Sequence, residues 1–297
     1  MMATNRSIID RIQALKTTYD ALKVGKASLL TLIDEAEIAE SVYNSNAIEN
    51  STLSLPETEK ILLEMEVSRN VSVREVYEAK NLARVSTYCK ALSKDRDITK
   101  EFICLLHGML LSGIDDSISG RFRSKHEYVR VGTHIAPAPE HIELLMDRLL
   151  GEYTGNLSVY PLDAIARYHL EFETIHPFND GNGRIGRVLI NLHLQRIGFP
   201  NIIIRDKEKQ EYYKGFKEYR VDKNSKTMER VITRAVIESL HKRITYLQGN
   251  EIIPLSDYVK DKNLGAPAIF NAAFRQTIPA FREKGVWKIA KNFKRAN

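Results

Sequence analysis

Apolar residues recur at spacings of three and four along most of this chain, which is the period of an α-helix with one buried face. The first such stripe contains Ile8, Ile12, Leu15, Tyr19 and Leu22. Capping residues mark where further helices begin and end, as in Ser54-Leu55-Pro56-Glu57. The predicted helices are 56–67, 73–92, 100–111, 141–152, 161–174, 182–197, 208–220 and 226–247. The pattern predicts a mainly α fold built as a helical bundle.

The segment 120–139 departs from the helical period. Residues 128–131 (Tyr-Val-Arg-Val) favour a strand, Gly132 permits a turn, and Pro137 and Pro139 block a helix. We therefore expect a small β-hairpin on the helical body.

A second change of pattern follows a linker at 248–250. Residues 251–297 hold two short apolar stretches and then Gly285, which lies between residues that favour strands. Helix, turn, helix and strand pair in this order are typical of a winged helix–turn–helix. The chain is thus expected to comprise an N-terminal helical region at 1–99, a helical core at 100–247 and a small C-terminal winged helix at 251–297.

Composition places the chain among globular proteins, with 43% hydrophobic and 28% charged residues. No apolar run reaches the roughly 20 residues that cross a membrane, and the polar start at 1–10 does not resemble a secretory signal. Cys89 and Cys104 lack metal-ligand spacing and fit a reducing compartment. A cytoplasmic protein without a membrane partner is therefore expected.

Charge is distributed unevenly. The formal net charge is +6, and the last 47 residues alone hold nine basic and four acidic side chains. Only this tail is a candidate for a polyanionic partner. Its segments 278–282 (Ile-Pro-Ala-Phe-Arg) and 285–289 (Gly-Val-Trp-Lys-Ile) resemble excisionase-type DNA-binding modules. That resemblance implies DNA contact through 251–297, and a structural or protein-docking role is the alternative.

The densest chemistry in the chain lies in one segment, His-Pro-Phe-Asn-Asp-Gly-Asn-Gly-Arg-Ile-Gly-Arg at 176–187. Gly181 and Gly183 permit positive φ, so backbone N–H groups can converge on an anion at the start of the following helix. Arg184 and Arg187 lie three residues apart on one helix face and can bind phosphate oxygens. The segment is therefore suited to a phosphate chain.

The same segment holds a metal-binding carboxylate and a base. Asp180 offers the hard oxygen that Mg²⁺ prefers beside phosphates, and His176 can accept a hydroxyl proton near neutral pH. Together with the anion site, these are the parts needed for phosphoryl or nucleotidyl transfer. Taken alone, His176 reads as a helix-capping residue and the two arginines as a solvated face, and the length of the pattern argues against both.

At every defining position the segment matches the Fic motif, H-P-F-x-D/E-G-N-G-R-x-x-R. The chain thus resembles the Fic family, which implies the Fic fold and transfer of AMP from ATP-Mg²⁺ to a Ser, Thr or Tyr hydroxyl of a target protein. By resemblance, His176 is the catalytic base and Asp180 the magnesium ligand. The implied nucleotide contacts are Phe178, Gly181, Asn182, Gly183, Arg184 and Arg187. Phosphate-transferring relatives tend to carry lysine at position 183, so glycine there favours AMP transfer.

Further upstream, Ser45-Asn46-Ala47-Ile48-Glu49-Asn50 resembles the inhibitory motif of Fic proteins, S/T-x-x-x-E-G/N. A carboxylate in a bidentate pair with Arg187 would occupy the space and charge that the γ-phosphate needs, and the α-phosphate would turn away from attack. We therefore expect Glu49 to inhibit the chain's own activity, with an ordinary solvated glutamate as the alternative. In some relatives this glutamate positions a water that removes AMP from the target, so de-AMPylation is a second candidate activity.

The hairpin at 120–139 resembles the Fic flap, which binds a target segment as an added strand. The resemblance places Val131, Gly132, Thr133 and His134 against the nucleotide, with His134 as a flap or ribose contact rather than a second base. A plain edge hairpin is the alternative.

Two tyrosines fall where the family contacts the nucleoside. Tyr212 and Tyr213 point about 100° apart on a helix, so only one can line the pocket, and Tyr213 is favoured. Relatives often carry asparagine where this chain has Arg220, which leaves UTP, GTP and CDP-choline open as donors. A DNA-binding regulator that uses the Fic body as a nucleotide sensor is a further alternative, although a sensor needs neither His176 nor Asp180. A homodimer is compatible with the sequence.

Overall fold

The computed structural model describes residues 5–67, 70–92, 96–155 and 159–294. Within these ranges α-helices dominate, which confirms the predicted mainly α class. The helices are α1 (Arg6–Leu22), α2 (Ala27–Ile48), α3 (Leu55–Leu63), α4 (Val73–Ala91), α5 (Lys100–Leu111), α6 (Ile142–Gly155), α7 (Pro161–Ile175), α8 (Asn182–Arg196), α9 (Lys209–Asp222), α10 (Lys226–Leu247), α11 (Leu255–Asp261) and α12 (Ala266–Phe274), with 3-10 turns η1 (Pro139–His141) and η2 (Asp206–Glu208). None of the described helices is long and apolar enough to span a membrane.

Helix α3 begins where the capping residues of the sequence predict. The Glu57 carboxylate accepts from the Ser54 N–H at 2.8 Å, and the Glu57 N–H donates to Ser54 Oγ at 3.4 Å, which forms a capping box. The helix ends at Leu63, four residues before the expected end. Leu63 and Met65 are 77% and 68% exposed, so their apolar side chains have no core that would extend the helix.

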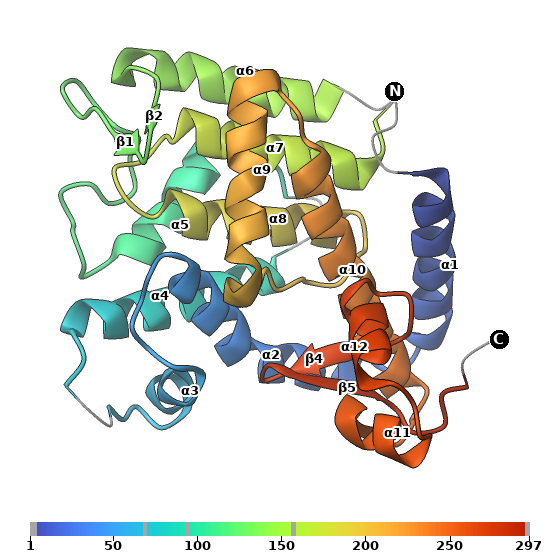
Figure 1. The fold of residues 1–297 in the computed structure, drawn as a ribbon. Coiled ribbons are helices and arrows are strands. Elements are labelled where there is room, and N and C mark those ends of the chain that lie inside the picture. Colours follow the sequence, from blue (N-terminus) through green and yellow to red (C-terminus); the bar gives the residue numbers. More distant parts are fainter. Residues whose placement is uncertain (1–4, 68–69, 93–95, 156–158, 295–297) are drawn as a thin grey trace.

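Two apolar cores share the helices α7 and α8. One core joins them to α4, α5 and α6, and the other joins them to α1, α9 and α10. The α7–α8 pair consequently lies in the middle of the bundle (Figure 1). Phe178, in the loop between these two helices, belongs to the first of these cores.

The predicted hairpin is present but short. Strands β1 (Arg130–Val131) and β2 (His134–Ile135) pair antiparallel, with Val131 opposite His134. The flanking chain is held by Arg123, whose Nη1 donates to Glu127 O at 2.8 Å and whose Nη2 donates to Pro137 O at 2.9 Å. These side-chain hydrogen bonds, rather than further strand pairing, hold the chain on either side of the hairpin.

The C-terminal module contains β3 (Ile252–Pro254), α11, α12, β4 (Phe281–Glu283) and β5 (Val286–Ala290), with strand order β3-β5-β4. It has its own small core and lies beside α2 and α10 (Figure 1). The two helices and the strand pair follow in the expected order, whereas β3, which pairs with β5, was not expected, and the assignment as a winged helix stays a prediction. Among the described residues of the module, Arg282, Lys284, Lys288 and Lys291 form ion pairs. Less charge is therefore free for a polyanion than the sequence indicates.

Candidate functional site

His176 ends α7 in a left-handed conformation (φ 50°, ψ 61°), and its N–H donates to Phe172 O at 2.8 Å. Arg123 fixes the turn that follows. Its Nε donates to His176 O at 2.9 Å, and its backbone N–H donates to Pro177 O at 2.8 Å. Nothing local in the sequence marks Arg123 for this role, because His176 lies 53 positions away.

The loop after Pro177 is braced by its own side chains. Asn182 Oδ1 accepts from the Phe178 N–H at 2.9 Å, and Asn182 Nδ2 donates to Phe178 O at 2.8 Å. The Phe178 ring is fully buried and stacks on His107 with 3.8 Å between ring centroids. The contact of Phe178 and Asn182 with the nucleotide stays a prediction, which these hydrogen bonds and this ring stacking limit to backbone groups. Both side chains are committed to the loop, so only their backbone groups remain for a phosphate.

The start of α8 already accommodates an anionic group. Gly181 precedes the helix with a φ of 78°, and Gly183 lies in its first turn. A Cβ at position 183 would lie 2.1 Å from Glu49 Oε1. Glycine at this position therefore leaves room for the Glu49 carboxylate at the helix N-terminus, where the partial positive charge favours an anion.

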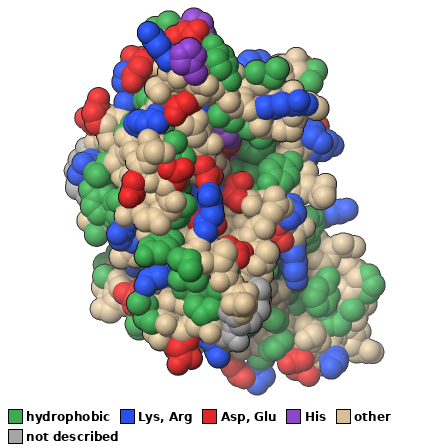
Figure 2. Space-filling view, turned by 90° about the vertical axis from the view of Figure 1, so that its left-hand side faces the viewer, with side chains coloured by type: hydrophobic (Ala, Val, Ile, Leu, Met, Phe, Trp, Pro, Cys, Tyr) green, Lys and Arg blue, Asp and Glu red, His purple; other side chains and the backbone are tan. Residues whose placement is uncertain are grey.

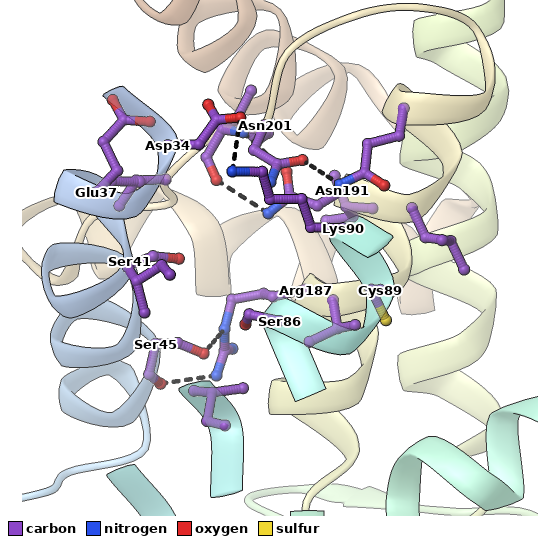
Figure 3. Close-up of a pocket in the computed structure, with 18 of the residues that line it drawn as sticks. Asp34, Glu37, Ser41, Ser45, Ser86, Cys89, Lys90, Arg187, Asn191 and Asn201 are labelled. Atoms are coloured by element: carbon purple, nitrogen blue, oxygen red, sulfur yellow. Dashed lines mark hydrogen bonds and ion pairs between the residues drawn. The ribbon is translucent and has the colours of Figure 1, made fainter. Parts of the chain in front are cut away.

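Glu49 follows α2 and reaches Arg187 on α8, where Arg187 Nη2 donates to Glu49 Oε1 at 2.8 Å. Arg187 Nε donates to Ser45 Oγ at 2.9 Å and Nη2 to Ser45 O at 2.8 Å. Figure 3 shows the Ser45–Arg187 contact at one end of a small cavity between α2, α4 and α8. The expected bidentate carboxylate pair is thus a single contact. Ser45 supplies two further acceptors, and the Tyr212 hydroxyl accepts from Arg187 Nη1 at 3.4 Å.

Asp180 lies in a cluster of charges. Arg74 Nη2 and Arg184 Nη2 donate to its carboxylate, the latter at 3.0 Å, and the Gly181 N–H donates at 2.6 Å. Burial raises the pKa of Asp180, but Arg184, the Gly181 amide and Arg74 outweigh it and hold the pKa below its usual value. Arg184 Nη1 also lies 3.1 Å from Glu78 Oε1.

One charged carboxylate beside an anion site suits Mg²⁺, which is usually held by one or two carboxylates together with substrate phosphates. Among the residues that the structure describes, no group of three His, Cys, Asp or Glu side chains could hold a metal ion. Asp180 is therefore a fitting single protein ligand, and phosphates and water would have to complete the coordination.

A cleft of about 760 Å³ opens in front of the loop. The face in Figure 2 is hollowed near its middle, with acidic and basic side chains around the hollow. The cleft is lined by Glu49, Val131, Gly132, Thr133, Glu173, His176, Gly183, Arg187, Tyr212, Tyr213 and Arg220, among others. The structure thus brings the flap, the candidate base and one arginine of the segment together.

Five of the expected nucleotide contacts do not line this cleft, namely His134, Phe178, Gly181, Asn182 and Arg184. Arg184 points to Glu78 and Asp180, so only Arg187 of the two arginines is available in the cleft. His134 Nε2 lies 2.9 Å from Thr174 O, which holds the ring against the end of α7.

Both tyrosines line the cleft, which corrects the expectation that only one of them can, but they differ in exposure. Tyr213 is 37% exposed, and its hydroxyl donates to Ile48 O at 2.7 Å. Tyr212 is buried, with its hydroxyl 2.7 Å from His169 Nε2. Tyr213 is therefore the side chain available to a nucleoside.

The surroundings of His176 keep its imidazole neutral. Burial, followed by the charges of Arg123 and Arg220, lowers the pKa of His176 to about 4. Glu173 Oε2 lies 3.7 Å from His176 Nδ1. Burial and the nearby Glu49 raise the pKa of Glu173 to about 8, so the carboxyl is mainly protonated at pH 7 and does not offset the cations. The spacing of three residues between Glu173 and His176 on one helix is a sequence signal for this contact.

Comparison with known proteins agrees with this geometry. Residues 97–194 match the model of the Fic/DOC family. Protein adenylyltransferase Fic of Nematostella vectensis is 32% identical over 215 residues, which cover 70% of this chain and 49% of that protein. The protein of the same name from Drosophila persimilis is 33% identical over 210 residues, which cover 68% of this chain and 41% of that protein. The chain thus spans less than half the length of these relatives.

Solved structures show the same architecture. A Fic domain containing signaling protein from Bacteroides thetaiotaomicron has a TM-score of 0.73 at 27% identity, covering 81% of this chain and 97% of that one. A Fic family protein from Desulfovibrio desulfuricans has a TM-score of 0.69 and covers 99% of this chain and 98% of that one, and its 19% identity is evidence of fold alone. The fold and the loop between α7 and α8 are those of Fic-domain proteins. This chain belongs to the Fic/DOC family.

Proposed function

We propose that this chain transfers AMP from ATP-Mg²⁺ to a Ser, Thr or Tyr hydroxyl of a target protein. The observation that carries the proposal is a single cleft in which the neutral imidazole of His176 lies beside a helix N-terminus that accommodates an anionic group. The two relatives compared above are both named protein adenylyltransferases, which supports the same reaction here.

Each part of the cleft has a task in this reaction. His176 takes the proton of the target hydroxyl while the hydroxyl oxygen attacks the α-phosphorus of ATP. The bond from the α-phosphorus to the bridging oxygen breaks, and pyrophosphate leaves. Backbone N–H groups at 181–183 and the N-terminal dipole of α8 stabilise the phosphate charge, and Arg187 binds the γ-phosphate. Asp180 would hold Mg²⁺, which neutralises further phosphate charge.

The same geometry leads us to propose autoinhibition by Glu49. Its carboxylate occupies the start of α8 and pairs with Arg187, and the phosphates of ATP need both places. The γ-phosphate and Glu49 therefore compete for one guanidinium. Since the Glu49 side chain is 39% exposed, it can also orient a water. De-AMPylation is accordingly a second activity within this proposal.

The target is proposed to dock along the flap. Within the described part of the chain, β1 and β2 pair only with each other. Tyr128, which precedes β1, and Ile135, which ends β2, expose apolar side chains. An extended segment of the target can add to such an edge through backbone hydrogen bonds. For residues 251–297 we favour docking on the chain's own body over DNA contact, because Arg282 and Lys284 pair with acidic residues of the helical body.

The donor can be tested directly. We expect the Glu49→Gly variant, given equal concentrations of labelled ATP, GTP, UTP and CDP-choline with Mg²⁺, to modify itself and lysate proteins mainly from ATP. The preference over the next donor should be at least about tenfold, the order that pocket contacts supply. Stronger labelling from another nucleotide would reassign the donor to that nucleotide. DNA retention in a gel shift without any labelling would favour the regulator instead.

The pH dependence of transfer should report the low pKa of His176. The base acts when neutral, so activity is retained above its pKa and lost as pH falls through it. For the Glu49→Gly variant, we expect the acid limb of kcat/KM near pH 4, the value that burial, Arg123 and Arg220 set for His176. Initial rates between pH 3.5 and 8 would check this expectation, with circular dichroism at each pH as the control for unfolding. An acid limb near pH 6.5 in a folded protein would contradict it.

A further inference from the structure

The turn that joins β4 to β5, residues 283–286, rests on the helix that carries the inhibitory motif. We infer that this wing turn holds α2 in the position from which Glu49 reaches Arg187, with Glu40 as the positioning residue. The inference rests on the proposed function and adds to it a regulatory part for the C-terminal module.

The wing turn binds Glu40 through its backbone. Lys284 and Gly285 have φ of 49° and 78°, and two consecutive left-handed residues turn their N–H groups to one side. The Lys284 N–H donates to Glu40 Oε2 at 3.0 Å, and the Gly285 N–H donates to Glu40 Oε1 at 3.1 Å. Lys284 Nζ also lies 2.9 Å from Glu59 Oε1 on α3. The turn therefore grips a carboxylate as an anion site does.

Buried ion pairs extend this contact. Arg205 bridges Glu40 at 2.5 Å and Glu238 of α10 at 2.9 Å. Arg282 of β4 donates to the same Glu238 through its backbone N–H at 3.0 Å and its Nε at 3.0 Å. No side chain in this group is more than 10% exposed. Loss of one partner would leave a buried charge uncompensated, so the wing turn and α2 separate only at a high cost.

The contact is connected to the inhibitory pair along α2. Glu40 lies nine residues before Glu49, about 13 Å along the helix axis. A second connection runs through Arg282 Nη1, which lies 2.5 Å from Glu208 Oε1 at the start of α9, the helix that carries Tyr213. Tyr213 in turn donates to Ile48 O at the end of α2. The wing turn thus braces the inhibitory helix directly, and Arg282 of the adjoining β4 braces it through the nucleoside side of the cleft.

Gly285→Val tests the inference with little disturbance of the body. A Cβ at position 285 would meet nothing within 4 Å, so the substitution acts through the strain of a β-branched residue at a φ of 78°. We expect transfer of AMP to rise about tenfold, within the usual range of coupling between two sites. Gly265→Val is the matched control, because Gly265 lies in the same module at a φ of −69° with equally open space.

The double variant Glu49→Gly/Gly285→Val separates regulation from a general change of the fold. If the wing turn acts through Glu49, the double variant has the activity of Glu49→Gly alone, and that activity also shows that it folds. The same rise in both backgrounds, or no rise in the single variant, would overturn the inference.

A readout without catalysis keeps the inference separable from the proposed function. Hydrogen–deuterium exchange over residues 40–49 should become faster in Gly285→Val and stay unchanged in Gly265→Val. Unchanged exchange in Gly285→Val overturns the inference even if the chain transfers AMP. If exchange becomes faster but the chain modifies no protein, the link between the wing turn and α2 is supported and the proposed function is rejected.

Discussion

Replacing Glu49 with glycine should raise AMP transfer about a hundredfold, the cost commonly attached to a misplaced reacting group. The substitution removes the carboxylate that lies 2.8 Å from Arg187 Nη2 and clears the space beside Gly183. Arg187 then meets the γ-phosphate, and the α-phosphate can settle opposite the target hydroxyl. Incorporation of label from the α-phosphate of ATP measures the effect.

Two controls define what this result means. Glu35→Ala changes an exposed glutamate of the same helix α2 and should leave the rate as it is. Glu49→Gln keeps the length of the side chain but loses its charge, so we expect a rise smaller than that of Glu49→Gly. A rate for Glu49→Gly equal to that of the natural sequence would reject the autoinhibition proposed here.

The sequence predicted where helices lie because helix period and capping depend on residues close together in the chain. The capping box of Ser54 and Glu57 needs residues three apart, and it starts α3 where the pattern predicts. The last turn expected for α3 was missed because exposure of Leu63 and Met65 depends on what other helices leave uncovered. Local rules thus give the elements, and packing decides where some of them end.

The sequence predicted those site residues that lie in segments resembling a known family, and no others. The pairing of Glu49 with Arg187 spans 138 positions, and only the resemblance to a family indicated it. Arg123 braces His176, and Glu78 draws Arg184 out of the cleft, through contacts between helices that no spacing in the sequence marks. The side chains of Phe178 and Asn182, two expected ligand contacts, likewise support the loop.

For the C-terminal module, net charge alone did not predict which basic side chains are free to bind a partner. Its excess of basic residues indicated a polyanionic partner, yet Arg282 and Lys284 pair with acidic residues of α10, η2 and α3. Net charge counts side chains and carries no information on whether a fold has already neutralised them. Ion pairs with the helical body thus engage two of the module's basic side chains, and DNA contact through the module stays a prediction.

Replacing His176 with alanine in the Glu49→Gly background should lower AMP transfer by about 10²–10⁴-fold, the contribution of a positioned general base. His176 is the residue of the segment whose imidazole is neutral and lines the cleft. Binding of ATP should persist, because the N–H groups of the loop and Arg187 are untouched, and calorimetry can measure it in parallel. His141→Ala, at an exposed histidine in η1, serves as the matched control. Retention of more than about a tenth of the rate would exclude His176 as the base, since such a small loss is typical of positioning alone.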